Sequence, residues 1–244
     1  MIINKIGKYH IDEGKNCQDA GASGYAESTS VKIVCDGCGS CPNSEVGANL
    51  FVDLFVNDEY FVDCNSSNIE RKVDEIYNKF FSLYDVSGDK EMARRADFLY
   101  KYFIFTILVT TEHEDYFDVN YCGDGYIITQ KHDNTIEFIE LDNVSGGGFT
   151  DFYVYNYFHA MNRYSDIDMK FRNMQFSKSE YKNVGVATDG LRFIVDAERY
   201  TEIYNAEELL SEFKDLLIAG KASAINRFIN RNANMFKDDI TIAF

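Results

Sequence analysis

The sequence predicts an α+β fold in which helices cover antiparallel sheets, and three observations support this class. First, segments with the length and composition of strands follow one another between about residues 102 and 141. Second, segments with apolar residues at helical spacing are grouped before and after these strands, at 45–84 and 209–229. Third, no repeat, Pro-rich linker or low-complexity tract interrupts the chain, so residues 1–244 are interpreted as one domain.

The N-terminal part is predicted to contain a strand, a loop, a second strand and a helix. Residues 1–12 have the character of a first strand leading into a loop. Residues 31–35 are rich in β-branched residues and end at an Asp-Gly pair, which indicates a buried strand. Asn43 or Ser44 can cap a helix over about 45–57, because their side-chain oxygens accept hydrogen bonds from the free amides of the first turn.

The remaining elements are predicted from the same kinds of pattern. A longer helix is expected over about 69–84, and the apolar run 102–109 is interpreted as a central strand covered on both sides. The pattern is weak over about 143–182, which we interpret as a surface flap or an irregular insertion. Strand character returns at 184–188 and around 192–195.

The charge of the chain limits its partners. There are 40 acidic and 24 basic residues, a formal net charge of −16, which opposes contact with nucleic acids and anionic membranes. The first residues lack the apolar core of a signal peptide, and the longest apolar run is too short to cross a bilayer. We therefore expect a cytoplasmic protein without nucleic-acid or membrane partners, whose six cysteines are reduced thiols.

An Asp-Gly pair ends a strand-like segment at three places in the sequence. These pairs are Asp36-Gly37, Asp124-Gly125 and Asp189-Gly190. Each pair alone is most often a turn, because type I′ geometry favours this dipeptide. Together with the Asp238-Asp239 pair before the last predicted strand, they place several carboxylates at strand ends. Such oxygen ligands could converge on one hard cation.

Six short motifs that include these pairs occur in one order along the chain. They are Asn16-Cys17-Gln18-Asp19, Asp36-Gly37-Cys38-Gly39-Ser40, Gly47-Ala48, Gly123-Asp124-Gly125, Ala187-Thr188-Asp189-Gly190-Leu191 and Asp238-Asp239-Ile240-Thr241. The series resembles that of the metal-dependent protein phosphatase family of the protein phosphatase 2C type, in a divergent bacterial branch. The resemblance implies a four-layer α-β-β-α sandwich with two central antiparallel sheets. It also implies a site for two Mn²⁺ or Mg²⁺ ions at one edge of the sandwich.

The resemblance also implies which residues hold the ions. Asp36 would bridge the two metals, and Gly37 would bind through its carbonyl oxygen. Asp189 and Asp238 would complete the protein ligands of the first metal. Asp124 is similar to the extra carboxylate of a third, weaker metal site.

The chemistry implied by the resemblance is hydrolysis of phosphoserine or phosphothreonine in a protein substrate, with a serine/threonine kinase as a further partner. Asp36 and Asp19 would be the catalytic residues, Asp19 by orienting metal-bound water. Two cations can activate a bridging water and stabilise the attacking and leaving oxygens, so no protein nucleophile is needed. This agrees with the lack of a Cys-x5-Arg loop or a G-x-S-x-G motif in the sequence.

The sequence departs from the family pattern where the substrate phosphate is expected to bind. Many members carry an Arg five residues before the Asp of the first motif, and here that position is Gly14. Lys15 and His10 are the nearby candidates for this role, although a Lys binds phosphate less specifically than a bidentate Arg. Arg192 is a third candidate for a substrate contact. Cys38 stands where other members have a His that is a candidate general acid.

These departures leave two alternatives to an efficient phosphatase. The first is a phosphatase-like module with weak or no catalysis, which binds a phosphoprotein or a kinase. The second is a thiolate metal or redox protein, because Cys35, Cys38 and Cys41 form a C-x2-C-x2-C motif that Cys17 could join. Tetrahedral thiolate sites usually combine two separated ligand pairs, which argues against this second alternative.

Overall fold

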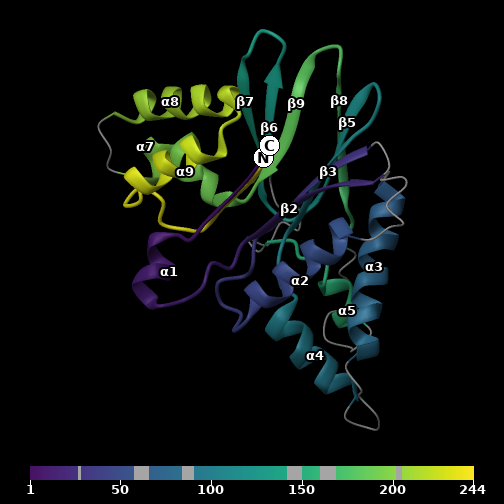
Figure 1. The fold of residues 1–244 in the computed structure, drawn as a ribbon. Helices are drawn as coiled ribbons and strands as arrows, with labels where there is room; N and C mark the ends of the chain where they lie inside the picture. Colours follow the sequence, from purple (N-terminus) through teal and green to yellow (C-terminus); the bar gives the residue numbers. More distant parts are fainter. Residues whose placement is uncertain (27–28, 58–65, 84–90, 142–149, 160–168, 202–204) are drawn as a thin grey trace.

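Two five-stranded antiparallel sheets lie at the centre of the molecule (Figure 1). The computed structural model describes residues 1–26, 29–57, 66–83, 91–141, 150–159, 169–201 and 205–244. Sheet A has, in spatial order, β1 (Ile2–Lys5), β10 (Ile240–Ala243), β9 (Tyr181–Ala187), β6 (Gly125–Lys131) and β7 (Ile136–Leu141). Sheet B has β2 (Ala20–Ala26), β3 (Thr29–Cys35), β4 (Ile107–Glu112), β5 (Tyr116–Cys122) and β8 (Arg172–Ser177).

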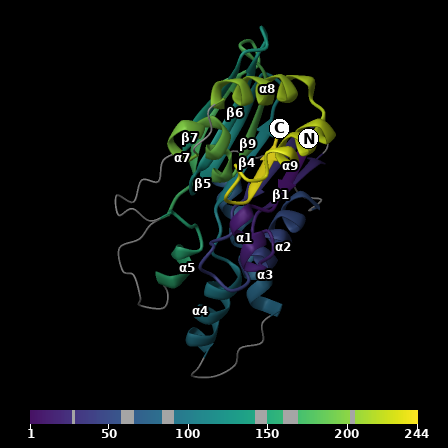
Figure 2. The ribbon, with the colours of Figure 1, turned by 90° about the vertical axis from the view of Figure 1, so that its left-hand side faces the viewer.

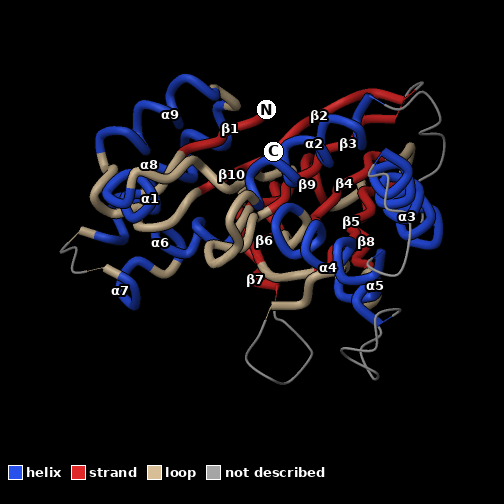
Figure 3. Tube along the Cα trace, turned by 90° about the horizontal axis from the view of Figure 1, so that it is seen from below, coloured by secondary structure: helices blue, strands red, loops and turns tan. Residues whose placement is uncertain are grey.

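Helices cover the outer face of each sheet, as the view from below shows (Figure 3). The helices on the side of sheet B are α2 (Ser44–Asn57), α3 (Ser66–Leu83), α4 (Glu91–Tyr102) and α5 (Tyr155–His159). Those on the side of sheet A are α1 (Lys8–Glu13), α6 (Arg192–Val195), α7 (Ala197–Tyr200), α8 (Ala206–Ala219) and α9 (Ala222–Arg231), with a 3-10 turn, η1 (Asp189–Leu191), before α6. The molecule is therefore a four-layer α-β-β-α sandwich, and this predicted fold class is confirmed.

The layers follow from the burial of both faces of the central strands. In β3, Ile33 packs in the core beneath α2 to α4, whereas Val34, the next residue, packs between the two sheets. Successive side chains of a strand point to opposite faces, so a strand between two cores needs apolar residues at nearly every position. The third core lies between sheet A and the pair α8 and α9, where Phe213 and Phe228 are buried.

The apolar run at 102–109 is not a single strand, contrary to the sequence prediction. Helix α4 continues to Tyr102, and β4 begins only at Ile107. Between them, Cys38 N–H donates to the Ile104 carbonyl oxygen and Thr106 N–H donates to the Asp36 carbonyl oxygen, both at 2.9 Å. The intervening residues therefore cross the end of β3. A short apolar run alone cannot distinguish these possibilities, because nearly all of its residues are buried in either case.

Three other predictions at the level of elements need correction. The predicted strand around 192–195 is helix α6, and the loop expected near residue 12 contains helix α1. The flap or irregular insertion predicted at about 143–182 lies partly outside the described residues. Its described part includes β8, which pairs with β5 along its whole length and extends sheet B. As an edge strand, β8 alternates exposed residues with half-buried or buried ones, and only one of its side chains, Phe176, is buried, so its apolar pattern is weak.

The two ends of the chain lie side by side in sheet A (Figure 2). In the pairing of β1 with β10, Ile2 lies opposite Ala243 and Lys5 lies opposite Ile240. The Met1 amine donates to the Phe244 carbonyl oxygen at 2.7 Å. None of the helices in the described residues is both long enough and apolar enough to cross a bilayer.

Candidate active site

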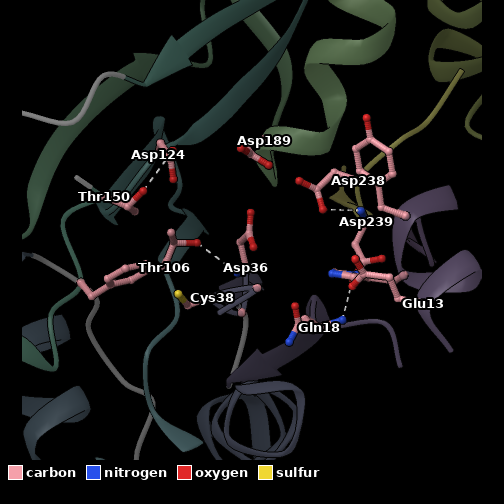
Figure 4. A pocket seen from close by; sticks show the side chains of 15 residues that line it. Glu13, Gln18, Asp36, Cys38, Thr106, Asp124, Thr150, Asp189, Asp238 and Asp239 are labelled. Carbon is pink, nitrogen blue, oxygen red and sulfur yellow. Dashed lines mark hydrogen bonds and ion pairs between the residues drawn. The ribbon is translucent and has the colours of Figure 1, made fainter. Parts of the chain in front are cut away.

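Four of the aspartates singled out in the sequence line one cavity of about 540 Å³. Asp36 follows β3, Asp124 lies in the turn between β5 and β6, Asp189 follows β9, and Asp238 precedes β10. Their side chains point into the pocket from different sides (Figure 4). The other lining residues are Tyr9, His10, Glu13, Gln18, Gly37, Cys38, Gly39, Thr106, Thr150, Phe152 and Asp239. The antiparallel topology thus gathers carboxylates that are up to about 200 positions apart in the sequence.

The backbone of Asp36 is fixed on both sides by Thr106. The amide of Asp36 lies 3.0 Å from Thr106 Oγ1, and its carbonyl oxygen accepts from Thr106 N–H at 2.9 Å. The next residue, Gly37, is buried, and a Cβ there would lie 2.5 Å from the Gln18 carbonyl oxygen and 2.9 Å from Ser44 Oγ. Only glycine fits this position, which keeps the end of β3 in place at the wall of the cavity.

Asp189 begins the 3-10 turn η1, and Arg192 contacts its carboxylate one turn later. The guanidinium of Arg192 forms an ion pair with that carboxylate, and Arg192 Nε donates to the Asp189 carbonyl oxygen at 2.9 Å. The guanidinium also lies over the ring of Tyr200. Arg192, a predicted substrate contact, is therefore engaged with a predicted metal ligand and does not line the cavity.

Asp239, the neighbour of Asp238, is buried and joins three parts of the chain. One carboxylate oxygen accepts from Gly7 N–H at 2.7 Å, and the other accepts from Gln18 N–H at 2.5 Å. His10 Nδ1 lies 2.9 Å from Asp239 Oδ2, at ion-pair distance but without hydrogen-bond geometry. The sequence analysis did not assign a role to Asp239, although the Asp-Asp pair was visible. His10, a predicted substrate contact, lines the cavity and is held against this carboxylate.

Asp19, predicted to orient water, is almost completely buried behind the cavity wall. Its Oδ2 accepts from Thr188 Oγ1 at 2.6 Å, and Thr188 Oγ1 accepts in turn from Thr241 N–H at 2.9 Å. Burial raises the pKa of Asp19 well above its usual value, and Asp239 and Asp238 raise it further, while the Thr188 hydroxyl opposes the rise. Asp19 thus reaches the site through Thr188, which precedes Asp189.

The carboxylates around the cavity repel one another. The pKa of Asp36 is raised well above its usual value, first by burial and then by Asp19, Asp238 and Asp124. A group of carboxylates that resists ionisation in this way is suited to a cation, and donors that are all oxygen atoms suit Mn²⁺ or Mg²⁺. No three acidic, His or Cys side chains of the described residues yet converge within joint reach of one ion. The carboxylates would therefore have to draw together, and Arg192 to yield Asp189.

The expected position of the phosphate-binding Arg serves a different purpose here. Gly14 caps the C-terminus of α1 with φ of 67°, a left-handed conformation that favours glycine. Lys15 Nζ contacts Glu13 Oε2 at 2.7 Å, and Lys15, a predicted substrate contact, is not among the residues that line the cavity. His10 is the only lining residue in the described part of the chain that could carry a positive charge.

Cys38 lies in the cavity wall next to Gly37, with its sulfur 3.2 Å from Ser40 Oγ. Hydrogen bonds from Cys41 and Ser40 lower the pKa of Cys38 to about 5, although burial opposes the change. Burial raises the pKa of Cys35, whose side chain packs in the core under α2. The thiolate metal cluster, considered as an alternative, is not formed by the described residues.

Three lining or supporting residues could not have been identified from the sequence. Thr106 lies in the run interpreted as a strand, and Thr150 Oγ1, which contacts Asp124 Oδ2 at 3.5 Å, lies in the region interpreted as a flap. Gln18 was visible only as the neighbour of Asp19. Their places depend on chain crossings that have no local pattern.

Comparisons with known proteins agree with this architecture. The structure is similar to that of the serine/threonine phosphatase Stp1 from Staphylococcus aureus, with 17% identity and a TM-score of 0.61 over 99% of this chain and 92% of that one. It is also similar to PppA, described as a key regulatory component of T6SS in Pseudomonas aeruginosa, with 13% identity and a TM-score of 0.57 over 99% and 94% of the two chains.

A third similar structure contains metal ions. It is the catalytic domain of the serine threonine protein phosphatase PstP in complex with two manganese ions, with 12% identity and a TM-score of 0.55 over 99% of this chain and 94% of that one. No curated protein matches the sequence. The family model for protein phosphatase 2C matches residues 6–228, and the chain belongs to this family.

Proposed function

We propose that the chain is a phosphomonoester hydrolase that requires Mn²⁺ or Mg²⁺ and acts on phosphoserine or phosphothreonine in proteins. The observation that carries the proposal is the single cavity into which carboxylates from four separated segments point. Membership of the protein phosphatase 2C family supports the phosphatase activity. The two manganese ions of the PstP structure support the choice of metal.

The chain offers suitable oxygen donors for two ions. Asp36 would bridge them, Gly37 would contribute its carbonyl oxygen, and Asp189 and Asp238 would hold the first ion, with Asp124 available to a third, weaker ion. When bound, the ions would supply an activated water and screen the charge of the phosphate. Thr106 and the crowded surroundings of Gly37 fix the end of β3, so the backbone of Asp36 and Gly37 is held in position before the ions bind, whereas the other carboxylates would draw together around the ions.

The remaining residues of the wall would position water and hold protons. Asp19 is tied to Thr188 and through it to the start of η1, so it can orient water from behind Asp189. His10 Nδ1 faces Asp239, which leaves Nε2 as the nitrogen able to donate to the leaving oxygen. Cys38 occupies the wall at the other candidate position for a proton donor, but its pKa of about 5 leaves the sulfur without a proton to donate near neutral pH.

Hydrolysis of an aryl phosphate and of a phosphothreonine peptide, with and without added Mn²⁺, tests this function. Asp36→Asn and Asp189→Asn should each lower kcat/KM by about 100-fold or more, because several kcal/mol of charge stabilisation is lost. Asp215→Asn, which changes an exposed aspartate of α8, is the matched control and should retain the rate. Activity that persists in EDTA, or in both site variants, would contradict the proposal.

One observation favours a second candidate, the phosphatase-like module that binds a phosphoprotein or a kinase with little turnover. No Lys or Arg lines the cavity in the described residues, and Lys15 and Arg192 are engaged with acidic partners. Calorimetry with the same phosphothreonine peptide separates the candidates. Micromolar binding without product favours the binding module, and rapid turnover of any phosphoprotein rules it out.

A further inference from the structure

Cys38 of the cavity wall and the buried Cys41 lie at the ends of one tight turn. Cys41 N–H donates to the Cys38 carbonyl oxygen at 2.9 Å, which closes a turn over Cys38-Gly39-Ser40-Cys41. Such a turn brings its terminal Cα atoms within about 7 Å, close to the 4.4–6.8 Å range usual for disulfides. The backbone thus already has nearly the separation that a disulfide needs.

The two thiols differ in their surroundings. Cys38 lines the cavity, where small molecules that enter the site can reach it, whereas Cys41 is 3% exposed and packs in the core beneath α2. This is the arrangement of an attacking thiol with a resolving thiol behind it. Cys17 and Cys122 contact oxygen atoms, namely Asn4 Oδ1 at 3.0 Å and the Asp151 carbonyl oxygen at 3.7 Å.

The turn is joined to the residues that would hold the ions. Cys38 N–H donates to the Ile104 carbonyl oxygen at 2.9 Å, and Ser44 Oγ donates to the Cys38 carbonyl oxygen at 3.2 Å. Gly37, directly before Cys38, is closely surrounded, because a Cβ added there would clash with the Gln18 carbonyl oxygen and with Ser44 Oγ. A displacement of Cys38 toward Cys41 would therefore be transmitted to the carbonyl oxygen of Gly37 and to Asp36.

We propose that Cys38 and Cys41 form an oxidation site for hydroperoxides, at which a disulfide closes in the cavity wall and lowers the hydrolytic activity of the site. The effect on activity rests on the proposed function, whereas the oxidation does not. The Cys38 sulfur attacks the peroxide, breaking its O–O bond, which gives a sulfenic acid and releases an alcohol, or water from hydrogen peroxide. The Cys41 thiol then displaces the hydroxyl group as water and forms the S–S bond. The two thiols lose two electrons and two protons, and the peroxide takes up both.

The test uses the full chain, reduced and then exposed to hydrogen peroxide. Remaining thiols are alkylated, and the mass of the peptide that contains residues 38–41 is measured by mass spectrometry. We expect this peptide to lose two hydrogens and to escape alkylation. The Mn²⁺-dependent hydrolysis of an aryl phosphate should fall about tenfold or more, because small displacements of positioning groups are costly, and dithiothreitol should restore it.

Two variants distinguish this site from general oxidation. Cys41→Ser cannot close the disulfide, so peroxide should drive Cys38 to the sulfinic acid and dithiothreitol should no longer restore activity. Cys122→Ser, on β5, is the matched control and should behave like the parent chain. The proposal is overturned if both thiols stay open to alkylation, if the disulfide joins other cysteines, or if the oxidised protein keeps its rate. A reduced protein without hydrolytic activity would contradict the proposed function instead, and the mass measurement would still decide whether the oxidation site exists.

Discussion

Asp239 connects two distant segments to the strand that completes sheet A. Its carboxylate accepts from the backbone amides of Gly7 and Gln18, so it holds the segments before α1 and before Asp19. Asp239→Asn replaces one acceptor oxygen by a donor, which leaves a buried N–H group without its acceptor. We expect the free energy of unfolding to fall by about 1–3 kcal/mol. Urea unfolding in EDTA measures this change.

The neighbouring residue supplies the control for this prediction. Asp238 lines the cavity and is a proposed metal ligand, and its Oδ1 accepts from Asp239 N–H at 3.0 Å, a bond that an Asn side chain can also accept. Asp238→Asn should keep its stability in EDTA but bind Mn²⁺ more weakly in calorimetry. Equal losses of stability in the two variants would show that Asp239 has no special role as a clamp.

At the scale of residues, four carboxylates singled out in the sequence line one cavity, whereas Lys15 and Arg192, the predicted cationic contacts, do not line it. Asp36, Asp124, Asp189 and Asp238 lie at strand ends, so alternation and the Asp-Gly pairs place them at one edge of the sandwich. The contacts of Lys15 and Arg192 could not be predicted in this way. Each of these two side chains is flexible and has an acidic partner nearby, and no backbone pattern specifies which partner it contacts.

At the scale of elements, Gly47 fixes how α2 meets the end of α4. A Cβ at Gly47 would lie 1.5 Å from the Tyr102 carbonyl oxygen, which is a backbone atom and cannot rotate away. Alanine favours helices by about 1 kcal/mol over glycine, yet overpacking typically costs about 1–3 kcal/mol. We expect Gly47→Ala to destabilise the protein and to lower activity, because Tyr102 leads into the segment that ends at Thr106.

Thermal unfolding and aryl phosphate hydrolysis check this prediction. Leu50→Ala, one turn further along α2, is the control, because Leu50 is 47% exposed and its truncation should change stability by less than about 0.5 kcal/mol. A Gly47→Ala variant as stable as the parent would mean that the two helices can shift apart freely.

The elements that the sequence predicted correctly are those with a strong period. Helices α2 and α3 overlap the ranges in which apolar spacing placed them. Helices α1 and α6 were missed because they have six and four residues, fewer than two turns, and so show no period. The boundary between α4 and β4 was missed because a completely buried segment carries no alternation.

At the scale of the whole molecule, Lys32 links the two sheets. Its side chain projects from β3, and its Nζ donates to Asn183 Oδ1 at 2.8 Å and to the Val184 carbonyl oxygen at 2.9 Å, both on β9. Burial lowers the pKa of Lys32 to about 8. Between this pH and the ordinary lysine pKa, the unfolded chain binds more protons than the folded one. The contribution of Lys32 to the free energy of unfolding therefore rises with pH. Below pH 8 the buried ammonium is charged, and its burial lowers the free energy of unfolding by the full amount.

The size of this effect follows from the shift. Between about pH 8 and pH 10.5 the parent chain should gain up to about 3 kcal/mol relative to Lys32→Met. Urea unfolding of both proteins across this range measures the difference. Lys182→Met, which changes an exposed lysine of β9, is the control. A constant difference between the parent and Lys32→Met would contradict the prediction.

The position of β10 has a consequence for biosynthesis. This strand follows all the others of the described chain in sequence, yet it lies inside sheet A, between β1 and β9. A nascent polypeptide leaving the ribosome therefore exposes the facing edges of β1 and β9 until β10 emerges. During that interval, strand-like segments of other nascent proteins could pair with these edges, and chaperones would have to protect them.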